Sequence, residues 1–172
     1  MSSKTQLHEY NTDVLILGAG ISGINAAYRI QESFLGLSYA IFEGREELGG
    51  TWSHFQHPGI RSDSDLHTFG FPWGPWTEER PIADGPSMLK YIKDVASRHG
   101  IDQHIQYHHS VTSIEWASEE QRWTIQVIAD DTEQNTCTSR FIFAATGLFD
   151  YEEGLRSTIQ GIEDFEGTVV HP

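Results

Sequence analysis

The sequence predicts an α/β protein in which helices flank a parallel sheet and an antiparallel β-meander is inserted into the same domain. Three observations predict this class: an apolar run ends in a glycine-rich turn, a segment with helical spacing follows, and three strand-like stretches come later. The 172 residues are enough for one domain with a hydrophobic core of its own.

The first predicted elements form a βαβ unit. Residues 13–17 (DVLIL) are apolar and mostly branched, which is typical of a strand buried in a parallel sheet. Small and apolar side chains recur at helical spacing over residues 21–33, and residues 39–43 predict a second strand. Because a helix connects them, the two strands are expected to be parallel.

The next segment, residues 44–86, predicts a long loop without a regular period. Its aromatic side chains argue against disorder. We expect four of them to form core rather than to contact a cofactor, and to wall one side of the domain: Phe69, Phe71, Trp73 and Trp76.

The second half of the chain predicts one helix and a meander. The helix is expected over residues 87–99, with Ser87 as its N-cap and Gly100 just after its end. Short polar turns separate the strand-like stretches, and the last stretch is expected to return to the parallel sheet. These strands are predicted at residues 111–117, 123–129 and 135–143, and the meander insertion is expected to cover residues 111–140.

The composition limits the partners and the location. With 25 acidic and 11 basic side chains, the net charge is −14, which repels nucleic acids and anionic lipids. Residues 1–10 are polar and expected to be flexible, and no apolar run is long enough to cross a bilayer. Cys137 is the only cysteine, which excludes an internal disulfide and favours a reducing compartment. A cytoplasmic protein is expected.

Metal binding and nucleophilic catalysis are not indicated by the residues. His104, His108 and His109 lie close together in the sequence, but no Cys or carboxylate stands at ligand spacing beside them, so surface histidines are expected. No nucleophile–base pair is recognisable. We therefore assign no catalytic residue, and any redox chemistry would come from a bound cofactor.

The strongest functional signal is the turn Gly18-Ala-Gly-Ile-Ser-Gly23, which matches G-x-G-x-x-G. It follows a predicted strand and opens a predicted helix, the context in which this motif is informative. Gly18 permits the tight turn, Gly20 lets the backbone approach a pyrophosphate, and Gly23 lets the helix pack on the strand. The helix N-terminus then offers N–H groups to the phosphates.

An acid and a second glycine pair complete the prediction of a nucleotide site. Glu43 ends the second strand, where its carboxylate can accept hydrogen bonds from ribose hydroxyls and would repel a 2′-phosphate. The glycine turn alone fits NAD or FAD. The pair Gly49-Gly50, followed by Thr51 and Trp52, favours FAD, because it lets another backbone segment approach the pyrophosphate.

These motifs, with residues 58–65 (PGIRSDSD) and 144–147 (AATG), resemble class B flavoprotein monooxygenases, that is, the flavin-containing and Baeyer–Villiger monooxygenases. Residues 59–76 and 82–85 are especially similar to the ethionamide-activating Baeyer–Villiger enzymes. The resemblance covers nearly all of residues 11–172. His57 departs from it, since the family has Tyr before this proline.

The resemblance implies a role for each matched position. Asp63 would lie near the isoalloxazine ring, Val111 would contact the adenine through its backbone, and Thr146 and Gly147 would turn the chain back against the cofactor. Arg61, Ser62 and Asp63 would also border the nicotinamide end of NADPH, although Arg61 and Asp63 could simply pair in a loop. The remaining implied FAD contacts are Ser22, Glu43, Gly50, Thr51, Trp52, Ser53 and His54.

The end of the sequence resembles the start of the monooxygenase fingerprint F-x-G-x-x-x-H-x-x-x-(W/Y). Phe165, Gly167 and His171 match it, and residues 162–172 are expected to begin a linker to an NADPH domain. The sequence contains no second glycine fingerprint, so residues 1–172 are expected to be a single FAD-binding domain.

Three functions remain open at this point. The chain is expected to be the FAD-binding portion of an NADPH-dependent monooxygenase, truncated and inactive alone. It could instead be half of a split enzyme with a separate NADPH-domain polypeptide, or a flavin-binding or scaffold protein without catalysis. A disulfide-reductase fragment is disfavoured, because the single cysteine cannot form a redox-active pair.

Overall fold

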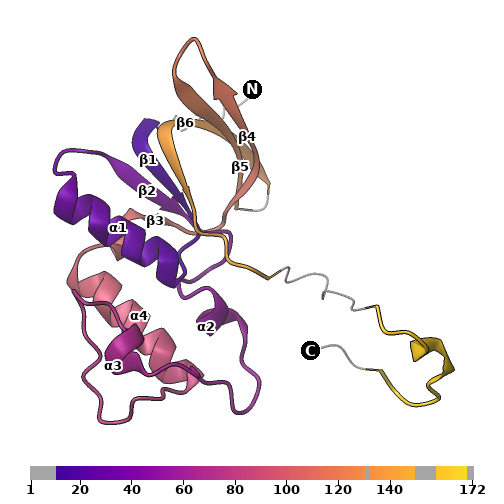
Figure 1. Cartoon of the computed structure of the whole chain (residues 1–172). Coiled ribbons are helices and arrows are strands. Elements are labelled where there is room, and N and C mark those ends of the chain that lie inside the picture. Colours follow the sequence, from indigo (N-terminus) through magenta and orange to yellow (C-terminus); the bar gives the residue numbers. More distant parts are fainter. Residues whose placement is uncertain (1–10, 131, 150–157, 170–172) are drawn as a thin grey trace.

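The computed structural model describes residues 11–130, 132–149 and 158–169. Within these residues one six-stranded sheet has the order β3-β2-β1-β6-β5-β4 (Figure 1). Its strands are β1 (Asn11–Leu17), β2 (Tyr39–Phe42), β3 (Ile105–Gln106), β4 (His109–Ala117), β5 (Arg122–Ala129) and β6 (Glu133–Ala144). The sheet is parallel among β3, β2, β1 and β6 and antiparallel among β6, β5 and β4. The predicted α/β class with a parallel sheet and a meander is confirmed.

Strand β6 belongs to both parts of the sheet. Its N-terminal half pairs with β5 in the meander, and residues 138–144 pair with β1 in parallel. The meander is therefore a continuation of the same sheet, reached through one long strand. This arrangement brings the end of β6 beside the ends of β1 and β2.

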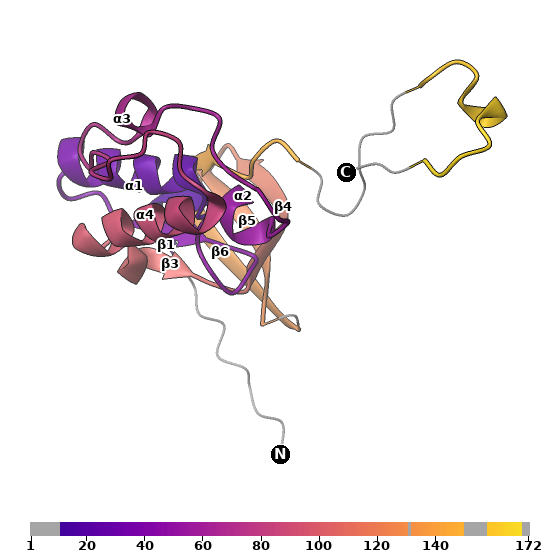
Figure 2. The same ribbon diagram turned by 90° about the horizontal axis from the view of Figure 1, so that it is seen from below.

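The helices lie on one face of the sheet (Figures 1 and 2). They are α1 (Ile21–Ser33), α2 (Thr51–His54), α3 (Leu66–Phe69) and α4 (Gly85–Arg98), with the 3-10 turn η1 (Asp102–His104). A second 3-10 turn, η2 (Ile162–Asp164), lies apart from the sheet. The bounds of α1 match the prediction. The predicted loop over residues 44–86 contains the two one-turn helices α2 and α3, which are too short to leave a periodic signal in the sequence.

The start of α4 differs from the prediction. Its N-cap is Asp84, whose side chain accepts a hydrogen bond from the Ser87 backbone N–H at 2.9 Å. The expectation that Ser87 caps the helix was wrong, because Pro86 is compatible with the first turn of a helix and lets it begin earlier. Gly100 follows the helix end as expected, with a φ of +65°.

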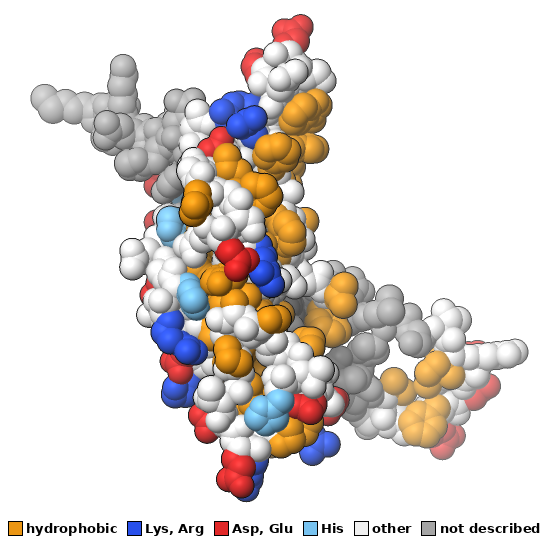
Figure 3. Space-filling view, turned by 60° about the vertical axis from the view of Figure 1, so that its left-hand side comes forward, with side chains coloured by type: hydrophobic (Ala, Val, Ile, Leu, Met, Phe, Trp, Pro, Cys, Tyr) orange, Lys and Arg blue, Asp and Glu red, His pale blue; other side chains and the backbone are white. Residues whose placement is uncertain are grey.

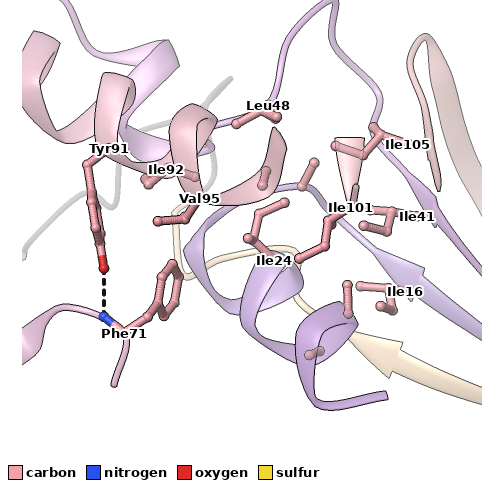
Figure 4. Packing of buried hydrophobic residues seen from close by; sticks show 14 of the residues in the cluster. Ile16, Ile24, Ile41, Leu48, Phe71, Tyr91, Ile92, Val95, Ile101 and Ile105 are labelled. Carbon is pink, nitrogen blue, oxygen red and sulfur yellow. Dashed lines mark hydrogen bonds between the residues drawn. The ribbon is translucent and has the colours of Figure 1, made fainter. Parts of the chain in front are cut away.

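Alternating residues of the central strands face two apolar clusters. Val14 and Ile16 of β1 pack with Ile24 of α1 and Ile92 of α4 in the larger cluster, shown in Figure 4. The intervening residues of β1 face the other side of the sheet and pack against the meander. That smaller cluster contains Leu15, Leu17, Ala40, Phe42, Ile125, Val127 and Cys137.

Two of the four loop aromatics are core residues. Phe71 and Trp76 are buried, and the Tyr91 hydroxyl accepts a hydrogen bond from the Phe71 N–H at 2.7 Å (Figure 4). Trp73 is half-buried and stacks on Tyr28 with ring centroids 4.0 Å apart. The core prediction was wrong for Phe69, which is 51% exposed, since it lies at the outer end of α3.

Candidate nucleotide-binding groove

A groove of about 530 Å³ lies where the parallel strands end. The carboxyl ends of adjacent parallel strands are where ligands bind in open α/β sheets. The turn after β1, the end of β2, the second glycine pair, the start of β4 and the segment after β6 form its walls. The lining residues are Leu17, Gly18, Gly20, Ile21, Ser22, Phe42, Glu43, Gly44, Arg45, Gly49, Gly50, Thr51, Trp52, His109, Ser110, Val111, Ile114, Ala145, Thr146 and Gly147.

Two of the three motif glycines are required by the fold itself. Gly18 has a φ of +100°, and a Cβ on it would lie 2.5 Å from the Ala145 carbonyl oxygen. A Cβ on Gly23 would lie 2.0 Å from the Gly18 carbonyl oxygen. Both contacts are with backbone, which cannot move aside as a flexible side chain can. The β1–α1 turn therefore has its shape because neither residue has a side chain.

Gly20 stands apart from the other two glycines. Its φ of −76° is open to any residue, and a Cβ there would meet Gly50 Cα at an ordinary 3.6 Å. Gly20 is the N-cap of α1 and supplies no capping side chain. In the part of the chain that the structure describes, nothing demands glycine here, so the bare backbone is available to a ligand in the groove.

The second glycine pair is tied to the first turn. The Gly49 N–H donates to the Ala19 carbonyl at 3.0 Å, and a Cβ on Gly50 would lie 3.1 Å from Gly20 Cα. Both residues of the pair have positive φ values, +128° and +57°. Two backbone segments without side chains thus meet at one end of the groove, at the N-terminus of α1.

Glu43 is fixed at the mouth of the groove by backbone donors. Glu43 is 8% exposed, its Oε2 accepts from the Ala19 N–H at 2.9 Å, and its Oε1 accepts from the Arg45 N–H at 3.0 Å. Each carboxylate oxygen has a second acceptor direction. The arrangement can receive a diol on the groove side while the carboxylate stays anchored.

Sequence reasoning missed one wall of the groove. Arg45, His109, Ser110 and Ile114 line it but were not assigned to the site. The His109 N–H donates to the Glu43 carbonyl at 2.9 Å, which joins the start of β4 to the end of β2. The distance in sequence between these strands hides this contact, although the nearby Val111 was assigned.

Two histidine rings lie against aromatic rings, one tilted and one stacked. The His109 ring lies 5.1 Å from the Phe42 ring, and the His104 ring lies 4.3 Å from the Tyr39 ring. His108 is exposed with a φ of 55°. In the described part of the chain, no group of three or more His, Cys, Asp or Glu side chains is placed to hold a metal ion.

Ten of the sixteen assigned site residues line the groove, and six do not. Gly23 lies beneath the turn, and Ser53 is buried with its hydroxyl donating to the Gly50 carbonyl at 3.0 Å. His54 is exposed at the end of α2. The other three, Arg61, Ser62 and Asp63, lie in the loop that leads to α3.

The loop residues Arg61 and Asp63 form an exposed ion pair, with 3.6 Å between Arg61 Nε and Asp63 Oδ1. Their side chains are 67% and 92% exposed. Ser62 between them is buried and hydrogen-bonds to the Ser64 backbone. The geometry of this loop is explained by these local contacts, and the implied contacts to a flavin or nicotinamide ring stay predictions.

The fingerprint-like segment has a specific local packing. In residues 158–169, the Phe165 ring folds over Gly167, and a Cβ on Gly167 would lie 2.4 Å from Phe165 Cζ. This contact gives a physical reason for the F-x-G spacing. Figures 1 and 2 show the segment apart from the sheet and helices. His171, the third matched residue, lies outside the described residues.

Comparison with known sequences agrees with this geometry. A family model for an NAD(P)-binding Rossmann-like domain matches residues 16–79. The FAD-containing monooxygenase EthA of Mycobacterium tuberculosis (strain CDC 1551 / Oshkosh) is 47% identical over 160 residues, which are 93% of this chain and 32% of that protein. The putative FAD-containing monooxygenase MymA of the same strain is 42% identical over 161 residues, again 93% and 32%.

The chain is homologous to the N-terminal part of FAD-containing monooxygenases. It spans about a third of the length of the curated relatives it matches. The predicted resemblance to the flavoprotein monooxygenases is thereby confirmed.

Solved monooxygenase structures share the fold. A steroid monooxygenase bound to NADP superposes with a TM-score of 0.74 at 27% identity, covering 89% of this chain and 29% of that one. OTEMO in complex with FAD and NADP gives 0.70 at 28% identity, covering 91% and 29%. The Rossmann-like assignment is confirmed by this agreement. Among the residues that the structure describes, no helix is long and apolar enough to cross a membrane.

Proposed function

We propose that this chain binds FAD and that the groove holds the ADP half of the cofactor. The observation that carries the proposal is the buried Glu43 carboxylate, held by two backbone N–H groups beside the bare backbones of Gly20 and Gly50. A dinucleotide needs both features, an acceptor for its ribose hydroxyls and a close backbone approach for its pyrophosphate.

The groove residues divide by their place along the ligand. Gly20, Ser22 and Gly50 would surround the pyrophosphate, and Glu43 would accept from the ribose. Val111 at the start of the meander would contact the adenine. Two further parts of the groove wall come from the start of α2, with Thr51 and Trp52, and from the segment after β6, with Thr146 and Gly147. These residues would lie beside the part of the cofactor that leads to the flavin ring.

The wider activity proposed is that of an NADPH-dependent flavin monooxygenase, of which this chain is the FAD-binding portion. Its support is the homology to FAD-containing monooxygenases and the structural likeness to enzymes solved with FAD and NADP. Bound flavin would supply the redox chemistry, while the residues of this chain bind and orient it. An NADPH-binding region, whether on a separate polypeptide or not, and a cytoplasmic location belong to the same proposal.

The test is whether the purified chain takes up FAD. Titration with FAD, followed by flavin fluorescence, should give saturable one-to-one binding. A hundred-fold excess of FAD over the Kd should stabilise the fold by about 2.7 kcal/mol and raise the Tm. FMN, which lacks the AMP portion and so cannot reach the ribose and adenine contacts, should bind far more weakly. Absence of FAD binding, or equal binding of FMN, would contradict the proposal.

A further inference from the structure

The groove has an unusual balance of charge for the ligand proposed. The protein carries a net charge of −14, and the groove itself contains the carboxylate of Glu43. Among its lining residues Arg45 is the one Lys or Arg side chain. A pyrophosphate entering this groove therefore meets a repulsive field, and Arg45 is the lining group that opposes it.

Arg45 is anchored between the two halves of the site. Its backbone N–H donates to Glu43 Oε1 at 3.0 Å, so the start of its side chain is fixed beside the ribose acceptor. Its guanidinium Nη1 reaches the Gly50 carbonyl at 3.5 Å. The side chain thus spans from the end of β2 to the second glycine pair, along the wall of the groove.

The hydrogen bond from Arg45 to Gly50 is not what holds the start of α2 in place. The Gly50 carbonyl already accepts from the Ser53 hydroxyl at 3.0 Å, the Ser53 N–H at 3.2 Å and the His54 N–H at 3.0 Å. At 3.5 Å the bond from Arg45 lies at the limit of hydrogen bonding and adds little to these three. Helix α2 therefore has its first turn without help from Arg45.

The guanidinium ends at the Gly50 carbonyl, close to the N-terminus of α1. Gly50 meets Gly20, and Gly20 is the N-cap of α1, a 13-residue helix without a capping side chain. A guanidinium has five N–H donors in a planar fork that matches phosphate oxygens. An Arg beside a helix N-terminus gives a diphosphate both a fixed dipole and a mobile charge to bind.

We propose that Arg45 recognises the diphosphate of the bound dinucleotide and makes binding to this acidic protein electrostatically favourable. The inference rests on the proposed FAD site and assigns to it a residue that sequence reasoning did not. The proposal gives two neighbouring residues different roles: Glu43 binds the ribose, and Arg45 binds the phosphates.

The experiment compares an anionic and a neutral form of the same ligand half. ADP and adenosine are titrated as competitors against FAD on the wild type, Arg45→Gln and Arg45→Lys. Arg29→Gln serves as the matched control, because it removes the same charge from the exposed surface of α1. The Tm of each variant without ligand reports the fold, and each titration is repeated at low and high salt.

Arg45→Gln should weaken ADP and FAD by about 10- to 100-fold and leave adenosine within about two-fold. Without the attraction of Arg45, salt screens only the remaining repulsion, so high salt should strengthen the binding of ADP to this variant relative to its effect on the wild type. Arg45→Lys should keep the salt dependence of the wild type and lose part of the affinity, since a point charge lacks the planar fork. Arg29→Gln should behave as the wild type does.

Two results would overturn the inference. In the first, Arg45→Gln binds ADP as tightly as the wild type. In the second, it weakens ADP and adenosine equally, which would mean that Arg45 shapes or stacks against the nucleoside. A wild type that binds neither FAD nor ADP contradicts the proposed function itself. If Arg45→Gln does not fold, Arg45→Lys decides the matter: a partial loss of ADP affinity with adenosine unchanged supports the inference, and an ADP affinity equal to that of the wild type overturns it.

Discussion

At the residue scale, three glycines of one turn lack side chains for different physical reasons. A Cβ on Gly18 or Gly23 would collide with backbone carbonyl oxygens at 2.5 and 2.0 Å, so the protein needs both whether or not a ligand is bound. Gly20 has room for a Cβ and an ordinary φ. Among the described residues nothing requires this position to lack a side chain, which supports a ligand that approaches from the groove.

This difference gives a paired prediction. Gly20→Ala should leave the ligand-free Tm almost unchanged and weaken FAD binding by about ten-fold or more, because the new methyl occupies the approach to the pyrophosphate. Gly23→Ala should fail to fold or lose several degrees of Tm. Thermal melts and FAD titrations of both variants provide the check. Tight FAD binding by Gly20→Ala would show that the cofactor does not contact this backbone.

At the scale of elements, helix α4 supports the site from behind, since its buried side chains pack against α1 and the sheet. Its first turn depends on Asp84. Hydrogen bonds from the Ser87 side chain and backbone hold the pKa of the Asp84 carboxyl below its ordinary value. A lowered pKa in the folded state means that the charged form stabilises the fold.

The pH dependence of this cap follows from the sign of that shift. Asp84→Ala should lower the Tm near neutral pH. The difference from the wild type should be fully present above the ordinary Asp pKa and vanish as the pH falls through the lower folded value. Asp84→Asn, which keeps a capping oxygen but does not titrate, should retain most of the Tm. A gap between wild type and Asp84→Ala that is constant from pH 7 to pH 2 would contradict the capping role.

At the scale of the whole molecule, one sheet joins the candidate nucleotide groove to the meander. The smaller apolar cluster connects β1 and β2 to β5 and β6, and Cys137 lies inside it with 2% exposure. Apolar side chains also remain on the outside, and Figure 3 shows hydrophobic surface along one face. Phe141, Phe143, Leu148 and Phe149 are each at least 46% exposed.

The reactivity of the Cys137 thiol shows whether the smaller apolar cluster stays packed. Burial raises the pKa of its thiol to about 11, so at pH 8 only about one molecule in a thousand carries the reactive thiolate. Labelling with a thiol reagent should therefore be slow in native buffer, should follow the unfolding curve in urea, and should be slowed further by FAD. Rapid stoichiometric labelling of the native protein would show that the two parts of the sheet separate easily.

The sequence by itself determined the βαβ unit, the bounds of α1, the meander and the position of Glu43 after β2. These features are set by local physics: alternation, helical spacing and glycines at a turn. The tertiary structure alone decided that β6 spans both parts of the sheet, and that Asp84 rather than Ser87 caps α4. It also decided that Arg45 and His109 face the groove beside Glu43. Such contacts depend on strand pairing between distant segments, which no short pattern in the sequence encodes.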